Sequence, residues 1–279
     1  MSTLAPAARP PVDPALRAAL AERHEPGRAG FVTQTLAFAW RALLKVKHTP
    51  EQLFDVVVTP IMFTVLFTYM FGGAIAGSTE AYLQFLLPGI LVQTVTFTTI
   101  YTGFTLNTDL SKGVFDRFRS MPLWPPAPLV GAMVGDTIRY TVSSLIVFVI
   151  GLVLGYRPET GLAGAALSIL VLNAFAFGIG WIFTTVALVV RTPSTVMTLS
   201  WLVLMPLTFA SNIYVDPATM PTWLQAFVGV NPVTLVVTAV RGLLDGTATA
   251  GAIGLGLLAP AVVTVVCAPL AMALYRRER

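Results

Sequence analysis

Asn107, Asp109 and Asp116 are the residues whose types and spacing come closest to a catalytic pattern. Oxygen ligands of this kind could hold Mg²⁺ against the diphosphate group of a prenyl substrate, as in a membrane prenyltransferase. That chemistry needs several carboxylates per metal ion, clustered so that they face the bound phosphates. Only Asp109 and Asp116 are available in this loop, so the spacing argues against such an enzyme.

Other residue types that could carry out a reaction are scarce. The chain has one cysteine and two histidines, which excludes an intrachain disulfide and a cysteine-based zinc or iron–sulfur site built by this chain alone. No HExxH or GxSxG motif is present, and none of Lys45, Lys47 and Lys112 follows a glycine, so the sequence has no Walker A loop. We expect no catalytic residue, metal site or cofactor in this chain.

The composition is that of an integral membrane protein. Of the 279 residues, 56% are apolar and 11% are charged, and the mean hydropathy is +0.79, whereas soluble domains contain about 25% charged residues. A helix needs about 20 largely uncharged residues to cross the hydrocarbon core. The gaps between charges predict an all-α fold with six transmembrane helices, over residues 53–74, 82–107, 129–155, 161–190, 194–215 and 250–275.

A further uncharged segment, from Pro217 to Val240, contains Pro221, Asn231 and Pro232. Irregular backbone at membrane depth is tolerated where neighbouring helices cover it. The prolines therefore favour two half-helices that enter and leave the membrane on one side over a further span.

The distribution of lysine and arginine predicts the orientation. Basic residues gather in cytoplasmic loops, and all of the 17 Lys and Arg except Arg157 and Arg241 fall on one side of the predicted spans. We therefore expect both termini to be cytoplasmic. Residues 1–30 contain five prolines and no apolar run suited to a signal peptide, which predicts a disordered tail rather than a segment that binds lipid or nucleic acid. The excess of arginine over lysine suggests a GC-rich bacterial genome.

Residues 31–50 are expected to form an amphipathic helix on the membrane surface. Leucines and Trp40 recur at helical spacing on one face, and Arg41 and Lys45 lie on another. Such a helix fits an interfacial element that leads into the first span. A plain juxtamembrane anchor explains the pattern as well.

The loop from Asp109 to Pro128 is the only predicted cytoplasmic loop between spans that is long enough to fold. Phe115 and Phe118 stand among basic residues on a short predicted helix that ends at Pro122. Exposed aromatic residues framed by arginines are typical of an interface with a soluble partner. The alternative is a loop whose arginines reach lipid headgroups.

The predicted spans contain few ionisable residues. A proton- or sodium-driven carrier normally holds Asp, Glu or His in the bundle interior. We expect no Asp, Glu or His deep in the predicted spans, because Asp136 and Arg139 would be paired at the headgroup level. Energy for transport would therefore come from another polypeptide. Polar residues that could line a pathway are equally well explained by hydrogen bonds between helices; they are Gln93, Thr96, Asn107 and Asn173.

Three sequence blocks, in this order and spacing, make the chain similar to the permease subunits of type-2 ABC exporters, and among these to the daunorubicin-resistance-like permeases. The blocks are FLLPGILVQT (85–94), DLSKGVFDRFRSMP (109–122) and MPTWLQAFVGVNPVTLVVTAVRGLL (220–244). The likeness extends over about residues 31–279. The chain differs from the family at the start of the second block. Members often have Glu there, whereas this chain has Asp109 and Ser111.

The resemblance implies roles for particular residues. The amphipathic segment corresponds to the family's elbow helix. The second block would contain the coupling helix, which sits in a cleft of the ATPase subunit; its residues are Lys112, Gly113, Phe115, Asp116, Arg117, Phe118, Arg119, Ser120, Met121 and Pro122. The third block would form an external re-entrant hairpin and the start of the last span, where the pathway is closed, with Trp223, Asn231, Pro232 and Arg241.

By this resemblance, two six-span permeases, either two copies or this chain with a sister permease, assemble with two ATPase subunits that bind ATP and Mg²⁺. The chain would have no active site and would move an amphipathic drug, antibiotic or lipid out across the bacterial cytoplasmic membrane. Its partners would be the ATPase, the second permease and membrane lipid. The alternatives are a permease for cell-envelope polysaccharide or glycolipid, a membrane enzyme acting on lipid, and a channel. The substrate does not follow from the sequence.

Overall fold

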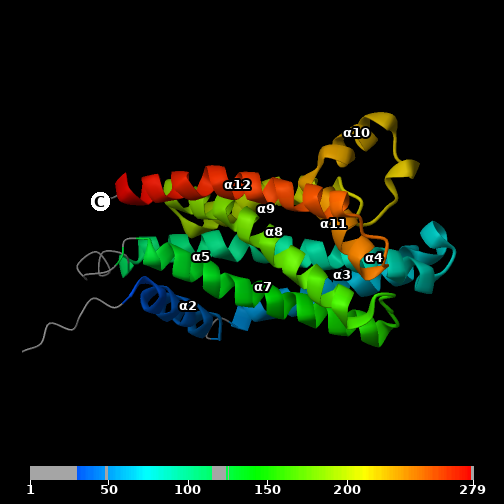
Figure 1. Ribbon diagram of the computed structural model, residues 1–279, viewed down its shortest axis with the longest axis horizontal. Helices are drawn as coiled ribbons and strands as arrows, with labels where there is room; N and C mark the ends of the chain where they lie inside the picture. The colour runs from blue at the N-terminus through cyan, green and yellow to red at the C-terminus, as the bar shows by residue number, and fades with distance from the viewer. Residues whose placement is uncertain (1–29, 48–49, 115–123, 125, 278–279) are drawn as a thin grey trace, which may run out of the picture.

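The structure is a computed structural model that describes residues 30–47, 50–114, 124 and 126–277. This part of the chain consists of helices and their connections and contains no strand, which confirms the all-α prediction. Figure 1 shows an elongated bundle in which most helices run along the main axis. Helix α2 (Phe31–Lys47) lies against one side of the bundle, and α10 (Thr222–Val230) projects from one end.

Five helical segments are long and apolar enough to cross a membrane. Each lies over one of the predicted spans. The second begins where the Ser78 hydroxyl accepts a hydrogen bond from the backbone N–H of Ala81 at 3.1 Å, an N-terminal cap. The five segments are α3 (Pro50–Ala76), α4 with α5 (Thr79–Thr98 and Ile100–Ser111), α7 (Ala127–Leu154), α8 (Gly161–Val189) and α12 (Ala250–Arg277).

The region predicted as the fifth span differs from this pattern. Helix α9 (Pro193–Phe209) has 17 residues, a length of about 26 Å, and the chain leaves the helix before residue 215. A 3-10 turn, η1 (Pro217–Thr219), leads to α10 and α11 (Pro232–Leu244), whose axes meet at 75°. This bent pair has the length and composition of a sixth crossing or of a re-entrant loop.

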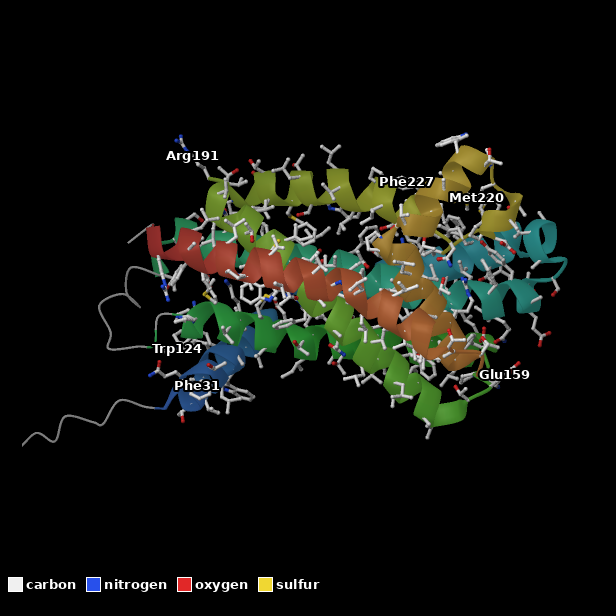
Figure 2. All side chains as sticks on the ribbon, turned by 45° about the horizontal axis from the view of Figure 1, so that its top comes forward. Phe31, Trp124, Glu159, Arg191, Met220 and Phe227 are labelled. Carbon is white, nitrogen blue, oxygen red and sulfur yellow. The ribbon has the colours of Figure 1, made fainter. Side chains whose placement is uncertain are left out.

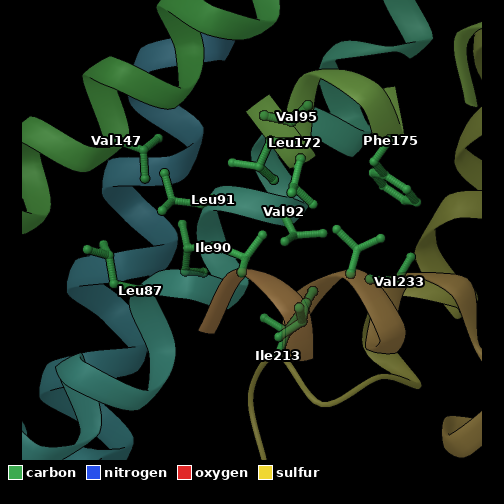
Figure 3. Packing of buried hydrophobic residues seen from close by; sticks show 14 of the residues in the cluster. Leu87, Ile90, Leu91, Val92, Val95, Val147, Leu172, Phe175, Ile213 and Val233 are labelled. Carbon is green, nitrogen blue, oxygen red and sulfur yellow. The ribbon is translucent and has the colours of Figure 1, made fainter. Parts of the chain in front are cut away.

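The α4–α5 segment forms the centre of the bundle. In its most apolar stretch 83% of the residues are buried, compared with 11% for α12. Leu87, Ile90 and Leu91 of α4 belong to a core that also contains side chains of α7, α8 and α11, as Figure 3 shows. The helix most enclosed by protein is therefore the one that contains the block FLLPGILVQT (85–94).

The two ends of the bundle carry different charges. Figures 1 and 2 place the C-terminal end of α12 and the labelled Arg191 at one end, and α10 and the labelled Glu159 at the other. We name the first the basic end, after Arg41, Lys45, Lys112, Arg191 and Arg276, where Asp109 also lies. We name the second the acidic end, after Glu80, Glu159, Asp216 and Asp245, where Arg157 and Arg241 also lie.

Candidate functional site

At the basic end, α2 packs closely along α7. Ala39 is buried in this contact. A Cβ atom added to Gly135 of α7 would lie 2.7 Å from the Cβ atom of Ala42 and 3.0 Å from the carbonyl oxygen of Ala39, so the two backbones approach as only small residues allow. The helix predicted for this segment is thus docked by its alanines, and large apolar side chains remain exposed on it, among them Leu36, Trp40 and Leu44.

One end of the loop between α5 and α7 is attached to α2 by ion pairs. Lys45 Nζ lies 2.5 Å from Asp109 Oδ1, and Arg41 Nη2 lies 3.4 Å from Asp109 Oδ2. The Asp109 carboxylate is largely enclosed, whereas the two cations remain partly exposed. Of the three predicted elbow residues, Arg41 and Lys45 therefore contact the start of the loop, and Trp40 is 64% exposed.

The other end of the loop is attached to the same helix. The backbone N–H of Trp124 donates to the side-chain oxygen of Gln34 at 2.8 Å, and Gln34 is buried. The rings of Phe31 and Trp124 meet edge to face with centroids 5.9 Å apart, side by side in Figure 2. Helix α2 thus contacts the chain at Asp109 and at Trp124, one on each side of residues 115–123.

Two of the predicted coupling residues fall within the described chain. Lys112 is exposed and caps the C-terminus of α5, and Gly113 turns the chain with a φ of +64°, where glycine is favoured. The remaining predicted coupling residues lie outside the described residues; these are Phe115, Asp116, Arg117, Phe118, Arg119, Ser120, Met121 and Pro122.

Asp136 and Arg139 of α7 form a buried ion pair. Arg139 Nη2 lies 2.8 Å from Asp136 Oδ1, which confirms the pairing predicted from their spacing, and the two residues are 6% and 7% exposed. The same nitrogen lies 3.5 Å from the Thr98 carbonyl oxygen and 3.4 Å from the Thr102 hydroxyl. The pair is therefore enclosed by helices, and Asp136 lies about 14 Å along α7 from its start; the sequence analysis expected the pair at the headgroup level.

The central helix breaks at Thr99, between α4 and α5. The Thr99 hydroxyl donates to the Thr96 carbonyl oxygen at 2.6 Å, and the hydroxyls of Thr94 and Thr98 donate to carbonyl oxygens four residues earlier. Threonine hydroxyls that bond helix carbonyls in this way bend helices. The row of threonines thus surrounds an interruption of one residue, Thr99, whose φ of −66° and ψ of −20° are still helical, so α4 and α5 together form one apolar segment.

An amphipathic cavity of about 110 Å³ lies beside this break, between α3, α4, α5 and α9. Phe97 and Trp201 face each other there with ring centroids 4.9 Å apart. Gln93 adds a polar group, whose oxygen accepts a hydrogen bond from the Tyr214 hydroxyl at 2.7 Å. The other lining residues are Thr59, Pro60, Phe63, Thr94, Thr98, Ile100, Tyr101 and Met197.

The other predicted pathway residues have structural partners outside this cavity. Asn107 donates to two carbonyl oxygens at the end of α8, at 2.6 and 2.8 Å. Asn173 of α8 donates to the hydroxyl of Thr141 of α7 at 3.0 Å. The Thr96 hydroxyl donates to a carbonyl oxygen of its own helix. Of the four predicted pathway residues, Gln93 lines this cavity, and Thr96, Asn107 and Asn173 do not.

At the acidic end, Asn231 joins the bent pair to α9. Its Nδ2 donates to the carbonyl oxygens of Leu207 and Ala210, at 2.7 Å each, and its Oδ1 accepts from the backbone N–H of Val233 at 2.9 Å. One side chain thus caps the C-terminus of α9 and the N-terminus of α11. Pro232 occupies the first position of α11, where no intrahelical donor is needed.

Arg241 of α11 connects to both α4 and the segment after α9. Its Nη2 donates to the carbonyl oxygens of Phe85 and Asn212, at 3.1 Å each, and its guanidinium carbon lies 4.1 Å from the centroid of the Phe85 ring. Asn231, Pro232 and Arg241 are thus brought together around this segment, whereas Trp223 of α10 is 72% exposed.

The same segment rests on a glycine of the central helix. A Cβ atom on Gly89 would lie 2.8 Å from Ile213 Cγ2 and 2.9 Å from Ile213 Cα. The Tyr82 hydroxyl donates to the Tyr214 carbonyl oxygen at 2.9 Å. Residues 210–216 therefore form a closure segment over the end of α4, held by contacts from α4 and α11; Figure 3 shows Ile213 among core residues.

Sequence reasoning missed several of these residues. Gly131 and Gly135 form a GxxxG pattern, a signal for close helix packing that could have been found. Gly89 lies in the first block of the resemblance. Gln34 and Tyr214 carry no local signal, because their roles depend on partners about 90 and 120 residues away in the sequence.

Comparisons with known proteins identify relatives of this chain. A family model described as ABC-2 type transporter matches residues 33–244. The chain is 48% identical to the daunorubicin resistance ABC transporter permease protein DrrB1 of Streptomyces coeruleorubidus, over 96% of this chain and 95% of that protein. It is 28% identical to the probable doxorubicin resistance ABC transporter permease protein DrrC of Mycobacterium tuberculosis, over 88% of this chain and 90% of that protein. A putative transport permease of Cyanophora paradoxa is 24% identical, over 76% of this chain and 74% of that protein.

Proposed function

The chain belongs to the ABC-2 type transporter family and is a permease subunit of an ABC exporter, and we propose that it moves an amphipathic aromatic drug or antibiotic out of a bacterial cell. Two of its relatives are named for resistance to daunorubicin and doxorubicin. The observation that carries the proposal is the cavity beside the Thr99 break, which combines aromatic walls with polar groups.

The chemistry of this cavity suits a flat ligand with hydroxyl or carbonyl groups. Phe63, Phe97, Tyr101 and Trp201 supply ring faces and edges, which bind other rings at centroid distances of roughly 4.5–7 Å. The Gln93 amide nitrogen can donate a hydrogen bond to a ligand, and the hydroxyl oxygens of Thr94 and Thr98, whose protons bind helix carbonyl oxygens, can accept one. No charged side chain is among the lining residues, so affinity would come from stacking, apolar burial and hydrogen bonds.

The size of the cavity supports a second permease. Drug-sized ligands occupy pockets of roughly 300–1,000 Å³, and the cavity in this chain measures about 110 Å³. Exposed apolar side chains lie elsewhere on the same two helices, α3 and α9, among them Met62, Leu66, Leu202 and Val203. A second copy or a sister permease packed there would complete the site.

The proposed exporter takes its energy from an ATPase subunit at the basic end. Positive residues gather on the cytoplasmic side of membrane proteins, so this end faces the cytoplasm together with both termini. The loop fixed by α2 at Asp109 and Trp124 would dock on the ATPase, which holds ATP and Mg²⁺. The bent pair α10–α11 lies at the opposite end (Figure 1) and would form the external re-entrant hairpin.

The test is co-expression with an ABC ATPase subunit, followed by purification and daunorubicin transport into inverted membrane vesicles. We expect a stable complex, ATP-dependent uptake, and a roughly tenfold higher KM for daunorubicin in Trp201→Ala, from the lost stacking and burial. Leu258→Ala on the exposed face of α12 is the control and should transport normally. Stimulation of the ATPase by a lipid-linked glycan and not by the drug would favour the polysaccharide or glycolipid exporter instead.

A further inference from the structure

Arg139 bridges the break in the central helix. Its Nη2 contacts the carbonyl oxygen of Thr98, the last residue of α4, and the hydroxyl of Thr102, in the first turn of α5. These partners stand on opposite sides of Thr99. The Thr102 hydroxyl lies 2.6 Å from that of Tyr140, so the first turn of α5 is tied to α7 twice. One side chain of a third helix therefore contacts both α4 and α5 at their junction, at 3.5 and 3.4 Å.

Asp136 keeps the guanidinium in this position through the 2.8 Å ion pair. A buried ion pair is weak evidence for stability, because replacing both charges by neutral residues is often neutral or stabilising. It does fix geometry, since a guanidinium has a rigid arrangement of donors. The pair thus specifies where α5 begins more than it adds to the stability of the bundle.

Helix α5 connects this contact to the loop at the basic end. It has 12 residues and is about 18 Å long. Its first residues, Ile100 and Tyr101, line the amphipathic cavity, and near its other end Asp109 binds Lys45 and Arg41 of α2. A displacement of the loop would therefore reach the cavity through a single short helix.

The two charged contacts face one shared space along α5. A second cavity, of about 50 Å³, is lined by Arg41 and Lys45 of α2, by Asp136 and Arg139 of α7, and by one face of α5. That face presents Thr102, Thr105, Leu106 and Asp109, at the spacing of a single helical stripe. The amphipathic cavity lies beside the same break and shares none of its lining residues with this second cavity.

We propose that Arg139 is a positioning residue that links the ATPase-facing loop to the substrate cavity. Through Thr98 and Thr102 it sets the angle at the Thr99 break, and α5 converts a change at Asp109 into a change of that angle. That the cavity binds substrate rests on the proposed function. The contacts of Arg139 at the junction of α4 and α5 do not depend on it.

The first test measures the break directly. Nitroxide labels at Glu80→Cys and Ser111→Cys, both exposed positions at the two ends of the broken span, report its end-to-end distance in a Cys267→Ser chain in lipid nanodiscs. We expect a narrow distance distribution in the otherwise unaltered chain and a shifted or broadened one in the Asp136→Asn/Arg139→Gln double variant. Arg191→Lys, in the exposed turn between α8 and α9, is the matched control and should leave the distribution unchanged.

An epistasis measurement makes this test specific. Asp109→Asn weakens the contact with α2 at the far end of α5 and should alter the distance distribution when Arg139 is present. In the double variant it should have no further effect, because the break is already released. Identical distributions in all variants, or equal effects of Asp109→Asn in both backgrounds, would overturn the proposal whether or not the chain exports a drug.

The second test uses the complex with the ATPase. The double variant should retain basal ATP hydrolysis within about twofold but lose at least tenfold in drug transported per ATP hydrolysed, and Arg139→Lys should recover part of that ratio. An unchanged transport ratio in the double variant would contradict the proposal. A complex of unaltered sequence that hydrolyses ATP and transports no drug would contradict the proposed function alone, because the distance measurement would still decide the role of Arg139.

Discussion

Asn231 donates a hydrogen bond to the carbonyl oxygen of Leu207 at 2.7 Å and so ends one helix while it begins another. Its side chain makes three hydrogen bonds in total. We expect Asn231→Ala to cost about 1–3 kcal/mol, because carbonyl groups at the end of α9 lose their donor. The thermal midpoint of the detergent-solubilised protein measures the effect. Trp223→Ala, on the exposed face of α10, should leave the midpoint nearly unchanged, and equal losses in both variants would contradict the capping role.

The contact between Gly89 and Ile213 predicts opposite outcomes for one type of substitution at two helical glycines. Gly89→Ala places a methyl group within 3 Å of Ile213 and should destabilise the protein by about 1–3 kcal/mol through overpacking. No atom lies within 4 Å of a Cβ added to Gly254, so Gly254→Ala should be neutral or stabilising by up to about 1 kcal/mol. Urea-dependent unfolding in mixed micelles compares the two. Equal effects would mean that the closure segment does not rest on Gly89.

The ion pair between Lys45 and Asp109 predicts an effect on coupling rather than on stability. Because Lys45 is one-third exposed, the pair is expected to contribute less than about 1 kcal/mol. Lys45→Asp should nevertheless reduce drug-stimulated ATP hydrolysis in the complex, since like charges would push α2 from the start of the loop. The exchanged pair Lys45→Asp/Asp109→Lys should restore most of that stimulation. If the exchanged pair assembles normally with the ATPase but does not restore the stimulation, the attraction between residues 45 and 109 is not needed for coupling.

Asp245, which follows α11 at the acidic end, is expected to make the stability of the protein depend on pH. Burial raises the pKa of its carboxyl group, Arg241 opposes the rise, and Glu159 adds to it. A raised folded-state pKa favours the protonated form, so this stabilisation is complete below the unfolded pKa of about 3.9 and is lost as pH rises through the folded value. Asp245→Asn should therefore be more stable than the unaltered protein at pH 7, and the difference should shrink as pH falls and disappear below about pH 4. A constant difference in thermal midpoint across this range would contradict the assignment.

The positions of the long helices follow from the sequence because burial in a membrane depends on runs of uncharged residues, which a single chain displays. The break at Thr99 and the early end of α9 do not follow. Both depend on hydrogen bonds from threonine hydroxyls or from Asn231, and the apolar pattern continues through them. Hydropathy therefore predicts where a span lies better than it predicts where its backbone bends.

The candidate site is only partly predictable for a related reason. Asn231, Pro232 and Arg241 were identified through the resemblance, and the structure places them around one segment. Gln34 and Tyr214 were missed, because a glutamine or tyrosine in an apolar sequence has no pattern until its distant partner is known. Asp136 and Arg139 were predicted as a pair, yet their contacts across the break at Thr98 and Thr102 required the packing of α7 on α5.

The close packing of α2 on Gly135 has a consequence for biosynthesis. Ribosomes make the chain from its N-terminus, so α2 is synthesised before α7, although α7 provides the surface on which its alanines are buried. During translation α2 must therefore wait without this partner until α7 has been made. Its exposed leucines and tryptophan would hold it on the membrane surface, and its docking on α7 would mark the first half of the protein as assembled.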